Sequence, residues 1–138
     1  MEPLTGLGAA AAASQLLVQG VKIAKFLAEL YGRCQEPDFI RKQIVQVEQL
    51  VEIARLIEDN PSLQKKAYIA SILESCGATA AKLLEILEKV AVKGEDGKVR
   101  KVQKAILSLL KEKETLHFFN DLEREKSSLI LCIQEIDS

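Results

Sequence analysis

The sequence has few aromatic residues and almost no net charge. Its 138 residues include four Phe, two Tyr and no Trp, so it lacks the aromatic sets on which RNA-binding modules stack bases. Its formal net charge of −1 gives no overall attraction for a polyanion. We therefore expect no nucleic-acid partner, and any electrostatic interaction must arise from a local cluster of charge.

Residues that bind metals or perform catalysis are also scarce. The one histidine, His117, has no second histidine or cysteine at metal-ligand spacing, and Glu114 with His117 gives only one of the Glu-x-x-His pairs that a bundle metal site uses. The cysteines are odd in number and widely spaced, which predicts reduced thiols in an intracellular protein: Cys34, Cys76 and Cys132. We expect no enzyme activity, no cofactor and no metal.

Proline and glycine are sparse, and the apolar residues between them recur with a period near 3.6, which predicts an all-α protein. We expect a first helix over residues 3–31, which ends before Gly32. Its predicted buried stripe is Leu7, Ala10, Ala13, Leu17, Val21, Ala24, Ala28 and Tyr31.

Capping residues and turn residues divide the rest of the chain. A second helix is predicted from an N-cap at Asp38 to near Asn60, with a buried stripe of Ile40, Ile44, Val47, Val51, Ala54 and Ile57. Asn60 is expected to cap one continuous helix that begins at Pro61 and ends before a turn at 94–97. After that turn, one helix is predicted to end near Leu110 and a last helix to begin near Thr115. Lys113 and Lys126 interrupt the apolar pattern of this region.

These elements predict one domain over residues 1–138. Its expected architecture is an up-and-down bundle of four to five helices with a long N-terminal helix. Because the connections are short, we expect helices that follow one another in the sequence to pack as antiparallel neighbours.

The first predicted helix lacks charge at its start. From Leu4 to Val21 no residue is charged, over about 18 residues or about 27 Å of helix, against a hydrocarbon core of about 30 Å. The leucines favour insertion into lipid, whereas the glutamines and glycines oppose it, so insertion is marginal. The alternative is that the alanines at 9–13 only allow close helix packing in the core.

A local excess of positive charge lies between residues 98 and 113. Only Glu112 is acidic there, against Lys98, Arg100, Lys101, Lys104, Lys111 and Lys113. Each basic residue near an anionic leaflet contributes about 1 kcal/mol to binding, so this cluster could dock the domain on acidic lipid. The alternative is an ordinary solvated helix face.

Three stretches of the sequence resemble one family. They are MEPLTGLGAAAAASQLLVQGVKIAKFLAELY, LQKKAYIASILESCGATAAKLLEILEKV and KAILSLLKEKETLHFFNDLEREKSSLIL. Together they are similar to the SesA-type N-terminal domains of fungal NLR-like (STAND) receptors, within the HeLo and HeLo-like group. The more specific markers are the Met-acidic-Pro-Leu opening, Ser75-Cys76, and Leu122-Glu123-Arg124 with Lys126-Ser127-Ser128-Leu129.

The resemblance implies a programmed cell-death effector of fungal innate immunity and heterokaryon incompatibility. Such a domain is expected to be cytoplasmic, to form a homo-oligomer when activated and to relocate to the plasma membrane, where its N-terminal helix meets lipid. The expected trigger is an NLR-type receptor or an amyloid-signalling partner. On this view the residues that enter the membrane are Leu4, Leu7, Leu16, Leu17, Val18 and Val21.

A second hypothesis is that the domain is an adaptor. Its helical faces would then bind partner proteins of a signalling receptor, and it would have no membrane activity of its own.

Overall fold

The computed structural model describes residues 7–31, 37–93 and 108–137. Over these ranges the chain is helical and has no strand, which confirms the predicted all-α fold with a long N-terminal helix. Its helices are α1 (Leu7–Tyr31), α2 (Pro37–Glu58), α3 (Pro61–Gln64), α4 (Ala67–Lys93) and α6 (Lys113–Asp137).

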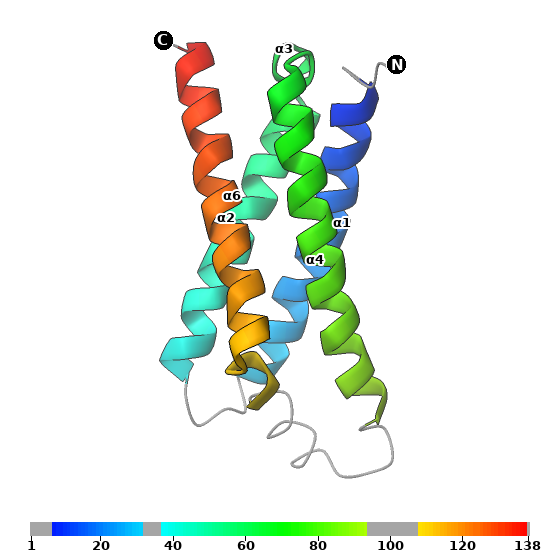
Figure 1. The fold of residues 1–138 in the computed structure, drawn as a ribbon, viewed down its shortest axis with the longest axis vertical. Helices are drawn as coiled ribbons and strands as arrows, with labels where there is room; N and C mark the ends of the chain where they lie inside the picture. Colours follow the sequence, from blue (N-terminus) through cyan, green and yellow to red (C-terminus); the bar gives the residue numbers. More distant parts are fainter. Residues whose placement is uncertain (1–6, 32–36, 94–107, 138) are drawn as a thin grey trace.

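The long helices alternate in direction, but their order in space differs from their order in the sequence. In Figure 1, α1 and α4 run downwards, whereas α2 and α6 run upwards. Helix α1 packs against α2 and α4, and α6 packs against α4 and to a lesser extent against α2. The long helices α2 and α4, which follow one another in the sequence apart from the short α3, therefore lie diagonally across the bundle. The parallel neighbours α1 and α4 were not expected from the short connections.

The short helix α3 makes this diagonal connection possible. It lies across one end of the bundle, where it touches α1, α2 and α4. The Asn60 side chain accepts hydrogen bonds from the backbone N–H groups of Ser62 and Leu63, at 3.1 and 3.4 Å, and Pro61 is the first helical residue. The predicted cap at Asn60 is thus confirmed.

The continuous helix predicted after Pro61 is wrong, because the chain turns at Lys65. The Gln64 amide donates to the carbonyl oxygens of Ile57 and Glu58, at 2.9 and 2.8 Å. These are among the carbonyls that the end of α2 leaves without intrahelical partners. This tie holds α3 against α2, and a separate helix α4 then starts at Ala67.

Two other predicted boundaries can be compared with the structure. Helix α2 starts at Pro37, so Asp38 lies in its first turn and is not the N-cap. The predicted break after Leu110 is confirmed, since residues 111–112 form a turn before α6 begins at Lys113. The turn predicted at 94–97 lies outside the described residues.

The core stripe was predicted well for α2 and wrongly for α1. In α2, Ile44 is half-buried and the other predicted residues are buried: Ile40, Val47, Val51, Ala54 and Ile57. In α1 the predicted Ala13 is buried, but the other buried residues were not predicted: Ala9, Leu16, Gly20, Ile23, Leu27 and Leu30. Val21 and Tyr31, expected in the core, are 45% and 40% exposed. Alanines on every side of α1 leave its apolar phase poorly defined.

Candidate functional site

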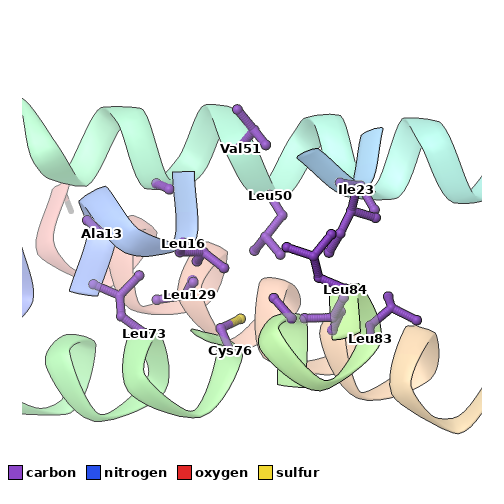
Figure 2. Close-up of a cluster of buried hydrophobic side chains, with 14 of the residues drawn as sticks. Ala13, Leu16, Ile23, Leu50, Val51, Leu73, Cys76, Leu83, Leu84 and Leu129 are labelled. Carbon is purple, nitrogen blue, oxygen red and sulfur yellow. The ribbon is translucent and has the colours of Figure 1, made fainter. Parts of the chain in front are cut away.

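Helix α1 is the predicted membrane-active element, and in this structure one of its faces forms part of the core. Figure 2 shows Leu16 close to Leu73 of α4 and Leu129 of α6, and Ile23 close to Leu84 of α4. Leu16 and Ile23 are each only 1% exposed. Any contact of this face with lipid therefore requires α1 to leave its neighbours.

Helix α1 lies very close to α2 at Gly20. A Cβ atom placed on Gly20 would lie 2.6 Å from Cγ2 of Val51, which is closer than real carbon atoms come. Glycine therefore allows the α1 backbone to rest directly on the Val51 side chain. Of the alanines at 9–13, Ala9 and Ala13 are fully buried in the core, whereas Ala11 is exposed.

Of two polar side chains on α1, one forms a hydrogen bond with a neighbouring helix and the other has a buried oxygen without a partner. The Ser14 hydroxyl donates a hydrogen bond to the Glu58 carboxylate at the end of α2. By contrast, the side-chain oxygen of Gln19 is buried on the α4 side, near Gly77, and has no hydrogen-bond partner. A buried acceptor without a partner costs about 1–3 kcal/mol, so Gln19 weakens the packing of α1 in the bundle.

The outer edge of the contact between α1 and α4 is open. A groove with a volume of about 270 Å³ runs there. Its full lining is Ala12 and Gln15 of α1 with Leu73, Glu74, Gly77, Ala78 and Ala81 of α4, and four of these seven residues are alanine or glycine. Because these side chains are short, they do not fill the space between the two helix backbones. The contact of α1 with α4 is also less extensive than its contact with α2.

The residues predicted to enter the membrane do not share one face of α1. Leu16 is buried and Leu17 is half-buried, whereas Val18 is 54% exposed and Val21 45% exposed. Two others are not placed: Leu4 lies outside the described residues, and so does the side chain of Leu7. None of the helices in the described ranges is long and apolar enough to cross a membrane.

The predicted lipid-docking cluster is only partly described. Lys111 and Lys113 are exposed, at the turn that precedes α6. The other members of the cluster lie outside the described residues: Lys98, Arg100, Lys101 and Lys104. The start of α6 and the start of α1 lie at opposite ends of the bundle (Figure 1). The structure therefore does not bring Lys111 and Lys113 together with the N-terminal end of α1.

The ionisable groups of the described residues show no arrangement typical of catalysis. His117 is largely exposed, with its Nε2 atom 3.4 Å from Asp121. Burial, together with Glu125, raises the pKa of the Cys76 thiol to about 12, and burial and Glu135 raise the pKa of Cys132. Both thiols are therefore poor nucleophiles at neutral pH. Within the described ranges, no three His, Cys, Asp or Glu residues are placed to hold a metal ion.

Sequence reasoning missed two polar contacts that join α6 to its neighbours. Glu125 accepts hydrogen bonds from Ser75 and Thr79 of α4. Lys126, the next residue, donates to two glutamine side chains of α2. In the sequence, Lys126 interrupts the apolar pattern of this helix, which shows that a polar residue lies on its inward side. The sequence did not show which residues bind it.

Comparison with known protein families gave a match over most of the chain. A family model described as SesA, the N-terminal domain on NACHT NTPases and P-loop NTPases, matches residues 19–116. The match includes the second half of α1 and the whole of α2, α3 and α4, and it leaves out the uncharged start of α1. Comparisons with curated proteins and with solved structures gave no significant match.

Proposed function

Because this chain belongs to the SesA family of N-terminal domains on NACHT and P-loop NTPases, we propose that it is a cell-death effector that acts on membranes. Membership of this family supports a signalling effector-type domain in a receptor context. The finer proposal is that the bundle rests in the cytoplasm, oligomerises on a signal from its receptor, and releases α1 to the plasma membrane.

The observation that carries this proposal is the absence of charge from the exposed side of the first part of α1, up to Val21; after it, Lys22, Lys25 and Glu29 are exposed. Ala11, Gln15, Val18 and Val21 face solvent, and the first charged residue of the helix is Lys22. Close helix packing explains why the buried side of α1 has small residues. It does not explain why the solvent-facing residues at its start are uncharged. The exposed side of α2 carries charges throughout, among them Arg41, Glu48 and Glu52. An uncharged exterior is what entry into lipid requires.

The energetics agree with release on a signal and not with spontaneous insertion. Leu16 and its buried neighbours must leave α2 and α4, and lipid can bury them again. Contact with α2 is close at Gly20, whereas the α4 side contains an open groove and the unpaired Gln19 oxygen. Released helices can then associate through their small residues, which favours oligomers in the membrane.

Two valine substitutions provide a matched test on liposomes. Val18 of α1 and Val45 of α2 are 54% and 44% exposed, so glutamate at either position should leave the melting temperature within a few degrees. A charge in the bilayer core costs about 2.5–3.5 kcal/mol, so Val18→Glu should reduce leakage of anionic vesicles by about 50-fold or more. Val45→Glu should cause as much vesicle leakage as the parent protein.

The opposite results would decide against the proposal. Equal leakage from folded Val18→Glu and Val45→Glu proteins would show that α1 is not the inserted element. If the parent chain itself fails to permeabilise vesicles at any concentration that saturates binding, then the domain signals by binding partner proteins, as an adaptor.

A further inference from the structure

The inward face of α6 is apolar at both ends and polar in the middle. Phe119 and Leu122 are buried near its start, and Leu129 is buried towards its end. Between them, the positions that would continue this stripe hold Glu125 and Lys126. Helix α6 therefore has fewer apolar anchors in the core than α1 or α2.

Glu125 joins α6 to α4 through hydroxyl groups. The hydroxyl of Ser75 donates to one carboxylate oxygen, and that of Thr79 lies 3.5 Å from the other. The hydroxyl of Thr79 also donates to the backbone carbonyl of Ser75, at 3.1 Å. Ser75 is exposed, so solvent reaches this contact and competes with it.

Lys126 joins α6 to α2 through neutral groups. Its Nζ atom lies 3.1 Å from the Gln46 side-chain oxygen and 2.6 Å from that of Gln49. Beyond this bridge, Leu56 of α2 stays 48% exposed and Ile130 of α6 stays 36% exposed. Helices α2 and α6 therefore bury little apolar surface between them, in line with their limited contact.

We propose that α6 is a lid that opens while α1, α2 and α4 remain packed, and that the contact of Glu125 with Ser75 sets how often it opens. Helices held by few buried apolar groups and by solvent-exposed hydrogen bonds open at lower free energy than the rest of a domain. Opening withdraws Leu129 from beside Leu16 and Leu73 (Figure 2). It thereby uncovers part of the buried face of α1, and this role in activation rests on the function proposed above.

Native-state hydrogen exchange of the full chain, read by mass spectrometry, tests the lid directly. Amides of α6 should exchange faster than those of α1 in the parent protein. Ser75→Glu places a second carboxylate against Glu125, and loss of hydrogen bonds to a charged group should then speed exchange in α6 by about tenfold or more. Ser71→Glu is the matched control, since Ser71 is an exposed serine one turn earlier on α4. It should leave α6 at the parent rate.

The lid is refuted if α6 and α1 exchange at one common rate in the parent, or if Ser75→Glu accelerates α1 as much as α6. Should Ser75→Glu fail to fold, Lys126→Met tests the α2 side, with faster exchange confined to α6 as the expected result. Exchange is measured without membranes, so it is independent of leakage. If α6 opens and no variant permeabilises vesicles, the lid stands and the proposed membrane function falls.

Discussion

Replacing Gly20 by alanine tests how closely α1 and α2 pack. The added Cβ would lie 2.6 Å from Cγ2 of Val51, and valine is stiff about χ1, so it cannot simply turn aside. Overpacking of this kind typically costs about 1–3 kcal/mol. Alanine is favoured over glycine inside a helix by about 1 kcal/mol, which offsets part of the cost. We expect a net loss of stability of up to about 2 kcal/mol.

Gly77 of α4 is a matched control for the same substitution. A Cβ there would meet only the Gln19 side-chain oxygen, at 3.9 Å, which is an ordinary contact. Gly77→Ala should therefore gain the full helix preference of about 1 kcal/mol, which for a chain of this length raises the melting temperature by about 4 °C. Because that preference is common to both variants, the difference between them isolates the overlap with Val51.

Urea denaturation followed by far-UV circular dichroism measures both variants. Adding Val51→Ala to Gly20→Ala should recover about 1 kcal/mol relative to the sum of the two single changes, because the smaller side chain makes room for the new methyl group. The reasoning is refuted if Gly20→Ala and Gly77→Ala stabilise the protein equally, since α1 and α2 would then have space between them at Gly20.

Two further predictions concern Cys76 and Asn60. The pKa of Cys76 is raised to about 12 in the folded protein from an ordinary value of 9.0, so the unfolded chain loses this proton first and stability should fall as pH rises above 9.0. The free energy of unfolding should fall by about 1 kcal/mol between pH 8 and pH 10, as measured by denaturation at both pH values. The Cys76→Ala variant should not show this part of the pH dependence. Asn60→Ala removes the acceptor for the N–H groups of Ser62 and Leu63 and should cost about 1 kcal/mol in the same assay, whereas Asn60→Asp should cost far less.

Features that depend on local sequence were predictable. Asn60 followed by Pro61 is a helix-start signal that acts within one turn, and it was read correctly. Most of the buried stripe of α2 was also predicted correctly, with Gln43 and Leu50 missed, because charged residues separate its large aliphatic residues at helical spacing. In each case the information lies within a few residues of the feature.

Features that depend on distant contacts were not predictable in the same way. The turn at Lys65 exists because the Gln64 amide reaches the carbonyl oxygens at the end of α2. Which face of α1 turns toward the core depends on the close approach of Gly20 to Val51. The run of alanines in the sequence could not indicate this face. At the candidate site, the lack of charge was visible in the sequence, but only the structure shows that Val18 and Val21 lie on the outside.

The parallel pairing of α1 with α4 also affects the order in which the chain can fold. Helices α1 and α2 adjoin in the sequence, so their hairpin can form by a short loop closure. Contacts between α1 and α4 join distant parts of the chain and must wait until α2 and the α3 crossover are in place. During synthesis from the N-terminus, α1 therefore stays uncovered on its α4 side until much of the chain has emerged. A nascent chain presents there the apolar surface that the finished bundle covers, and this is the stage at which it is most exposed to premature association.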